Sequence, residues 1–154
     1  MAATGPGSSQ GLRVTSAVAS DRNYRRAIIG SMASDPLTNL RQVCLALPET
    51  TERLSHGEPT WFVRDRKTFV NYADHHHDDR LAFWCAAPAG VQQSLVASDP
   101  ERFFVPPYVG HRGWLGVYLD VPVDWDEIAE IVEDAYRMIA SQRLIAELDG
   151  RETQ

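Results

Sequence analysis

Cysteine is scarce in this sequence: Cys44 and Cys85 are the only two among 154 residues, and both stand among apolar neighbours. Two cysteines do not make a disulfide framework, and buried free thiols are typical of a reducing compartment. No apolar run approaches the ~18 residues that a membrane-spanning helix needs. The N-terminus also has no apolar segment of signal-peptide length. We therefore expect a cytoplasmic protein that does not enter a membrane.

The motifs of common enzyme classes are absent as well. The sequence has no Gly-x-Ser-x-Gly turn that would present a nucleophilic serine. It has no glycine-rich phosphate loop, because Gly110 and Gly113 stand too close together and precede no helix. Ser55 and His56 are neighbours in the sequence, but adjacency does not make a catalytic triad. We therefore expect a protein without enzymatic activity and without a cofactor.

Histidine and aspartate are concentrated in one run over residues 75–79. On an extended backbone, residues 75, 77 and 79 would point the same way, and both residue types are real metal ligands. The run, however, lies in a polar turn between two expected strands, and nothing elsewhere supplies a second set of ligands. We interpret it as a solvated hairpin loop and predict no metal site.

Charge is unevenly distributed along the chain. Residues 1–34 carry four arginines against one aspartate, whereas residues 35–146 carry ten Lys and Arg against seventeen Asp and Glu, a net charge of −7. A domain of this sign repels a phosphate backbone, so any nucleic-acid binding by it must be weak and strongly salt-dependent.

Apolar periodicity predicts an alternation of helices and closely spaced strands. Asp35 and Pro36 suit the start of a helix whose apolar face continues to residue 47. Asp124 begins the clearest helix, with acidic first turns and a buried stripe that reaches residue 145. A third helix is expected over residues 88–97. The expected strands cover residues 61–63, 68–72, 80–85, 103–105 and 114–120, and residues 50–59 are expected to form a loop.

Three regions follow from this pattern. Residues 1–34 are rich in Gly, Ser, Thr and Ala, and we expect a disordered basic extension. Residues 35–146 form one folded domain, and residues 147–154 form a polar tail that frays. Closely spaced strands pair antiparallel, so the fold class is α+β, a two-layer sandwich with helices packed on one face of an antiparallel sheet.

The segment over residues 103–114 combines aromatic residues, two prolines and two glycines. One interpretation is core filling beside a conformationally demanding turn. The other is a pocket or stacking surface, in which four large rings converge on one groove for a small ligand or a protein partner. The four rings of this hypothetical groove are Trp61, Trp84, Tyr108 and Trp114.

Five blocks of the sequence, in order, resemble the MmcQ/YjbR family. The blocks cover residues 47–52, 57–61, 67–69, 106–108 and 113–120. The resemblance spans about residues 36–145, and the chain also has the Trp-Cys-x-Ala-Pro and Phe-Phe-Val-Pro-Pro-Tyr-Val-Gly segments of one branch. It implies a CyaY-like α+β fold. It implies no catalytic residues.

The resemblance also implies DNA as a partner, through a double-wing arrangement of hairpins. Carried onto this sequence, the first wing is the hairpin tip with Arg64, Arg66 and Lys67, and the second is the loop with His111 and Arg112. Basic side chains at wing tips can contact phosphates without reading bases. We therefore expect a binding module, with DNA as one candidate partner and a small molecule or protein in the aromatic groove as the other.

Overall fold

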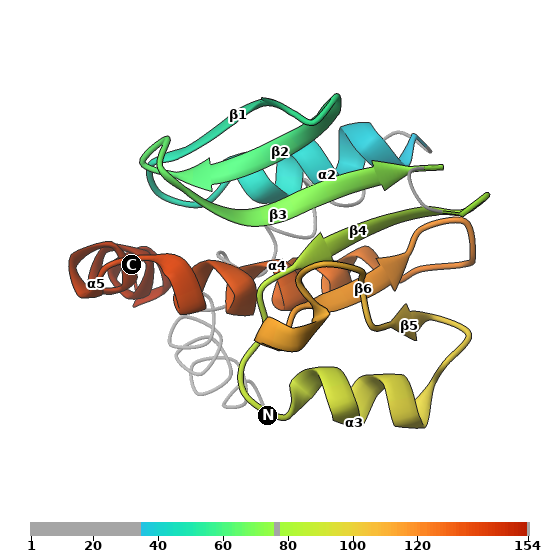
Figure 1. Cartoon of the computed structure of the whole chain (residues 1–154). Helices are drawn as coiled ribbons and strands as arrows, with labels where there is room; N and C mark the ends of the chain where they lie inside the picture. The colour runs from blue at the N-terminus through green and yellow to red at the C-terminus, as the bar shows by residue number, and fades with distance from the viewer. Residues whose placement is uncertain (1–34, 76–77, 154) are drawn as a thin grey trace, which may run out of the picture.

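A computed structural model describes residues 35–75 and 78–153 of the chain. The predicted extension over residues 1–34 lies outside the described residues, as do His76 and His77 of the histidine run. Six strands form one antiparallel sheet in the order β1-β2-β3-β4-β6-β5 (Figure 1). Their bounds are β1 Thr50–Ser55, β2 Glu58–Val63, β3 Lys67–Asp74, β4 Leu81–Cys85, β5 Phe103–Phe104 and β6 Leu115–Tyr118.

Two tight turns join the first three strands. His56 and Gly57, between β1 and β2, have φ values of 53° and 82°. Arg64 and Asp65, between β2 and β3, have φ values of 53° and 57°. Consecutive positive φ angles are the signature of type I′ turns, whose twist matches that of the flanking strands. These turns set which residues stand at the two ends of the sheet.

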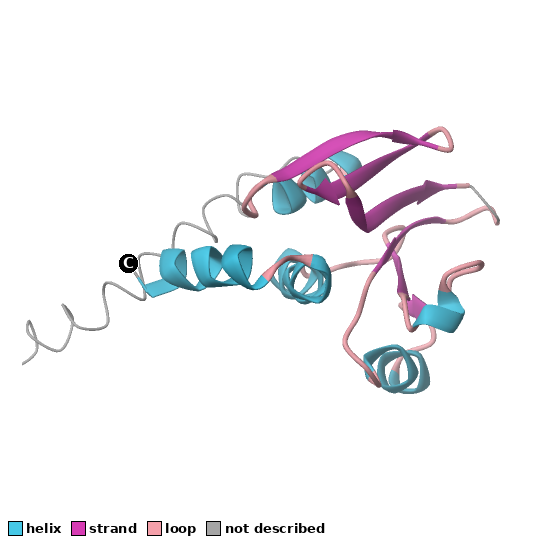
Figure 2. Cartoon of the chain, turned by 60° about the vertical axis from the view of Figure 1, so that its left-hand side comes forward, coloured by secondary structure: helices cyan, strands magenta, loops and turns pink. Residues whose placement is uncertain are grey.

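Two helices cover one face of the sheet. The first is α2 (Pro36–Leu45), which begins where the Asp35 carboxylate accepts the N–H of Leu37. The other is α4 (Trp125–Ile139), which begins at Asp124 in the same way. In Figure 1 both helices lie behind the strands, while the loop between β5 and β6 lies in front of them. Figure 2 shows the same separation from another side.

The core lies between these helices and the inner face of the sheet. Phe83 of β4 and Tyr136 of α4 are fully buried there, and Phe69 of β3 meets Tyr136 edge-on at a ring distance of 5.8 Å. The Tyr136 hydroxyl donates a hydrogen bond of 2.9 Å to the Pro48 carbonyl, which ties α4 to the chain between α2 and β1. A buried hydroxyl with a partner avoids the cost of an unsatisfied polar group.

The other two helices lie outside this layer. Helix α3 (Val91–Ser98) contacts β5 at the edge of the sheet (Figure 1). Helix α5 (Gln142–Thr153) follows α4 after a break at Ala140, and its Leu144 and Leu148 join the core. The expected single helix to residue 145 is therefore two helices, and the prediction of a frayed tail over residues 147–154 is wrong up to Thr153. Burial of Leu148 holds this segment in place.

A second expectation is also wrong. Residues 50–59 were expected to form a loop, but they contain β1 and the start of β2. Strand β1 is exposed and polar because it is an edge strand, so its sequence lacks the apolar pattern of an inner strand. The α+β class is confirmed. Among the described residues, no helix combines the length and the apolar character needed to cross a membrane.

Candidate functional site

The sheet has an outer face, turned away from α2 and α4. Residues directly opposite one another in antiparallel strands share a face. Thr60 of β2, Asn71 of β3 and Trp84 of β4 are neighbours in this register, and Gly116 of β6 follows. By the same alternation, Glu58 belongs to this row of the outer face. A mixture of polar and aromatic side chains distinguishes the outer face from the apolar inner one.

A groove of about 1010 Å³ lies along this outer face and continues around the end of the sheet, where β3 begins at Lys67 and α4 ends at Ile139. Its side chains come from β2, β3 and β4, from Ser55 at the end of β1, from the first hairpin turn, from the loop before β6 and from Ile139 at the end of α4. The groove is at the upper limit of the range of about 300–1,000 Å³ that small-molecule sites occupy. The polar and aromatic residues that line it include His56, Glu58, Lys67, Asn71, Trp84, Tyr108, Arg112 and Trp114.

The loop before β6 forms one wall of the groove and is held from behind by Gln92 of α3. The Gln92 amide donates to the carbonyls of Gly110 and Trp114, at 2.8 and 2.6 Å, and its side chain is buried. Gly113 has a φ of 82°, which favours glycine. The wall is thus held by hydrogen bonds from a buried side chain to its carbonyls and by turn geometry, which limits its movement.

Most cations of the described chain are neutralised by carboxylates. Of the fifteen Lys and Arg residues, four lie in residues 1–34, which leaves eleven. Eight of these eleven are within 4.0 Å of a carboxylate oxygen. Among described residues, the three without such a partner are Arg66, Lys67 and Arg112. A cation without a partner retains its full capacity for an external anion.

Two of these three cations, Lys67 and Arg112, line the groove. They come from the two loops that the sequence predicted as wings, so the structure brings one member of each predicted wing to the same site. The Arg112 guanidinium also lies 5.6 Å from the centroid of the Trp114 ring, within the range of a cation–π contact. Lys67 and Arg112 therefore give the groove a positive end.

The remaining wing residues lie elsewhere. Arg64 pairs with Glu49 at 3.4 Å, so its charge is compensated within the chain. Arg66 and His111 are exposed and do not line the groove. Of the five predicted nucleic-acid contacts, three lie outside the groove.

Three of the four predicted aromatic residues line the groove, namely Trp84, Tyr108 and Trp114. Trp114 is only 5% exposed and belongs to the core, so Trp84 and Tyr108 supply most of the accessible ring surface. The prediction is wrong for Trp61, which is fully buried. Its indole N–H donates to the Glu52 carboxylate at 3.0 Å, and the Arg41 guanidinium donates to the same carboxylate. Trp61 faces α2 because strand alternation places it opposite to Thr60.

Sequence reasoning did not assign His56, Glu58 or Asn71 to this site. His56 and Asn71 lie outside the blocks that carry the family resemblance, and Glu58 lies in one of these blocks but has no role attached to it. A strand pattern that began at Glu58 would have placed Glu58 and Thr60 on one face, but the polar stretch over residues 50–59 concealed it. Tyr108 is 74% exposed and has a φ of 67°, a feature that the sequence also did not indicate.

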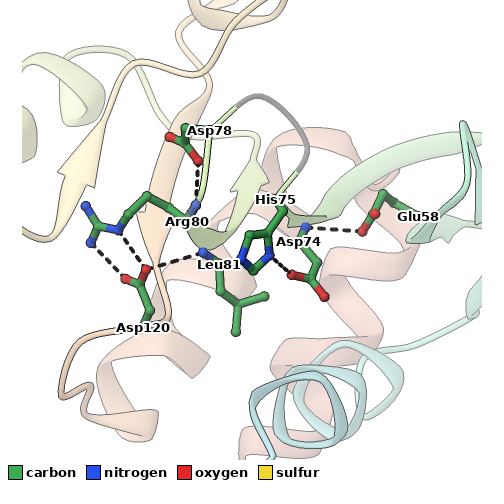
Figure 3. A network of polar contacts seen from close by, with 7 residues as sticks. All are labelled: Glu58, Asp74, His75, Asp78, Arg80, Leu81 and Asp120. Atoms are coloured by element: carbon green, nitrogen blue, oxygen red, sulfur yellow. Dashed lines mark hydrogen bonds and ion pairs between the residues drawn. The ribbon is translucent and has the colours of Figure 1, made fainter.

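The end of the groove away from Lys67 is acidic. Glu58 accepts the backbone N–H of Asp74 at 3.3 Å, and the Asp74 carboxylate pairs with His75, whose pKa this hydrogen bond raises (Figure 3). Arg80 forms two hydrogen bonds of 2.7 Å with Asp120 nearby (Figure 3), and they lower the pKa of that carboxyl. The charge along the outer face therefore changes from positive near Lys67 to negative near Glu58.

A smaller pocket of about 170 Å³ shares Trp84 with the groove. Phe104 and Pro107 supply apolar surface there, and Asp78 and Arg80 also line it. Arg80 is already paired, so this pocket has no free cation to offer. It extends the aromatic surface around Trp84 without adding to its positive end.

Chemistry at other positions is limited within the described part of the chain. Burial raises the pKa of both cysteine thiols, so neither is poised to act as a thiolate. Residues 35–75 and 78–153 contain no group of three or more His, Cys, Asp or Glu side chains placed to hold a metal ion. Over these same ranges, no hydrogen bond joins Ser55 to His56.

Comparison with known proteins places this fold in a family. The YjbR family model matches residues 45–138, which is more than half of the chain. The crystal structure of Deinococcus radiodurans protein DR2400, a DUF419 domain, has a TM-score of 0.57 and 17% sequence identity, covering 71% of this chain and 85% of that chain. At that identity the likeness shows the fold alone. No curated protein matches the chain. On the strength of the family model, the chain belongs to the YjbR family.

Proposed function

We propose that this protein is a non-enzymatic binding module whose groove takes a small anionic ligand with a flat ring. The observation that carries the proposal is the position of Lys67 and Arg112. These are two of the three cations without a carboxylate partner in the described chain, and both line a groove that also contains Trp84, Tyr108 and Trp114. Unpaired cations next to ring surfaces match a ligand that offers a negative group and a π-face.

Electrostatics favour a small ligand over a long polyanion. The domain over residues 35–146 has a net charge of −7, which repels an extended phosphate backbone. A ligand that fits within the groove experiences mainly the local field of Lys67 and Arg112. Local attraction acts over a few ångströms, whereas more distant surface charges are screened over about 8–10 Å at physiological salt.

The naphthalene carboxylate 2-naphthoate is a suitable minimal probe, because it joins one anionic group to one flat ring. At about 0.3 kcal/mol for each of its roughly 13 heavy atoms, we expect a Kd on the order of 1 mM. Ligand-observed NMR at low salt measures it. The uncharged 2-naphthamide should bind at least tenfold more weakly.

Charge reversal locates this binding. The Lys67→Glu and Arg112→Glu variants should each lower the affinity for 2-naphthoate about tenfold or more. The matched control is Arg143→Glu on α5. It changes the net charge by the same amount, but this arginine pairs with Glu49 and does not line the groove. Equal losses in all three variants, or no binding by the unmodified protein, would refute the proposal.

DNA is the second candidate, and the observation that favours it is that Arg66, Lys67 and Arg112 are all exposed, the first two at the β2–β3 hairpin and the third in the segment before β6. Three phosphate contacts predict a slope of log Kobs against log salt of about −3. Fluorescence anisotropy with short duplexes at low salt tests this. No binding at tens of micromolar protein would exclude DNA as a ligand. Unchanged binding by an Arg66→Glu, Lys67→Glu double variant would exclude the hairpin tip as the site of DNA contact.

We also propose a cytoplasmic location. The support is that Cys44 and Cys85 are free and buried, a state typical of proteins in a reducing compartment. Fractionation of cells that produce the protein with its natural N-terminus tests this. Recovery in a membrane or secreted fraction would contradict it.

A further inference from the structure

We infer that the ligand of the groove is a nucleoside phosphate whose base carries N–H donors on its edge, an inference that rests on the proposed function. The groove presents three kinds of group in a fixed order along the strands: cations, then aromatic surface, then a carboxylate. A nucleotide presents the matching groups in the same order: a phosphate, then the flat base, then the hydrogen-bonding edge of that base.

The register of the strands establishes this order. Lys67 begins β3, and Asn71, in the middle of that strand, stands opposite Trp84. Lys67 and Asn71 pair with Val63 and Thr60, which are only three positions apart on β2 because a bulge lies between them, so about 10 Å of strand separates the two residues. The long side chain of Lys67 reaches over part of that span. Trp114 precedes β6 by one residue, which places it on the Lys67 side of Trp84.

Glu58 stands beyond the aromatic surface. It begins β2, two residues before Thr60, which pairs with Asn71, so it lies about 7 Å further along the strands. It lines the groove together with the two cations. The groove is therefore positive on one side of Trp84 and negative on the other. This difference sets the orientation of a ligand that has one anionic end.

The carboxylate of Glu58 selects for hydrogen-bond donors. One of its oxygens accepts the Asp74 N–H at 3.3 Å, and an ionised carboxylate has about four acceptor sites in total. It repels a phosphate and accepts N–H groups from a base, as carboxylates do with base amino groups. Asn71, which can donate and accept, stands next to the same part of the groove.

Guanosine monophosphate is the probe that tests this order, because guanine has adjacent N–H donors on one edge. Isothermal titration calorimetry with the full chain should give at least tenfold tighter binding of this nucleotide than of guanosine or of inorganic phosphate. Inosine monophosphate lacks one of the donors and should bind severalfold more weakly. The Glu58→Gln variant should remove this difference, whereas Glu130→Gln, on an exposed position of α4, should retain it.

The outcomes separate this inference from the proposed function. If 2-naphthoate binds but the nucleotide binds no more tightly than inorganic phosphate, the inference is overturned and the proposed function stands. If neither probe binds, both are overturned. Urea unfolding of each variant shows whether it folds, and the Glu58→Gln result counts only at unchanged stability; otherwise the comparison between the guanine and inosine nucleotides in the unmodified protein decides.

Discussion

Gly116 stands on the outer face of β6 at a point where a side chain has no room. A Cβ atom at this position would come within 2.4 Å of the Phe104 ring, which itself stacks on Tyr118 at 4.5 Å. The aromatic surface beside the smaller pocket therefore requires a glycine, for reasons of packing rather than backbone freedom.

Replacement of this glycine gives a direct test of that packing. The Gly116→Ala variant should lower the free energy of unfolding by about 1–3 kcal/mol, the usual cost of overpacking. The control is Gly150→Ala in α5, where a Cβ meets nothing within 4 Å. There the substitution should be neutral or stabilising by about 0.5–1 kcal/mol, because alanine favours a helix. Equal effects in urea unfolding would contradict the packing role.

Tyr136 links stability to alkaline pH. Burial raises the pKa of its hydroxyl to about 12, above the ordinary value of 10.0. The folded state therefore holds this proton more tightly than the unfolded state, so the stabilisation is complete below pH 10 and is lost as the pH rises to about 12. Tyr136→Phe should flatten this loss, measured by urea unfolding between pH 9 and 12.

The Tyr136→Phe variant should also be less stable at neutral pH. Loss of the hydrogen bond to the Pro48 carbonyl should cost about 1 kcal/mol. Burial also raises the pKa of Tyr72 to about 12, so some alkaline dependence should remain in Tyr136→Phe. If Tyr136→Phe had the same free energy of unfolding as the original protein, and the same dependence of it on pH between 9 and 12, the hydroxyl of Tyr136 would not have the role given to it.

At the scale of elements, α3 acts as a support for the groove wall. Gln92 is its buried residue, and its amide reaches two carbonyls of the loop before β6. Gln92→Leu should cost about 1–3 kcal/mol, because two carbonyls lose their donor. It should also increase hydrogen exchange over residues 108–114. Gln93→Leu, on the exposed side of α3, is the control. Unchanged exchange in Gln92→Leu would show that α3 does not hold the wall.

Helix α5 should contribute to stability despite its polar sequence. Leu148 is 5% exposed and belongs to the core. Leu148→Ala should lower the free energy of unfolding by about 2–4 kcal/mol, as for other buried leucines, whereas Gln142→Ala at an exposed position should have little effect. A negligible effect of Leu148→Ala would restore the prediction that residues from 147 onward fray.

The sequence predicted those elements whose burial is one-sided. Helices α2 and α4 have an aspartate at the start and an apolar stripe, so the start of each was located correctly. Strand β1 was missed because an edge strand needs no apolar alternation. Helix α5 was joined to α4 because the break between them, at Ala140, has no proline or glycine to mark it.

At the scale of the whole molecule, the two faces of the sheet have different roles. The inner face forms the core with α2 and α4, and the outer face carries the groove. Composition indicated many large rings but not their division between faces, which depends on register. One shift between Trp61 and Phe62, a bulge between β2 and β3, is enough to change that division. The grouping of Lys67 with Arg112 likewise depends on tertiary structure.

The measurement that tests the central claim most directly is a map of amide chemical-shift changes on titration with 2-naphthoate. The groove predicts the largest changes at Thr68, Asn71, Trp84, Arg112 and the Trp114 indole N–H, with 2-naphthamide producing much smaller ones. Changes that centre on α2 and α4, or no changes at millimolar probe, would contradict the claim that the outer face of the sheet is the binding site.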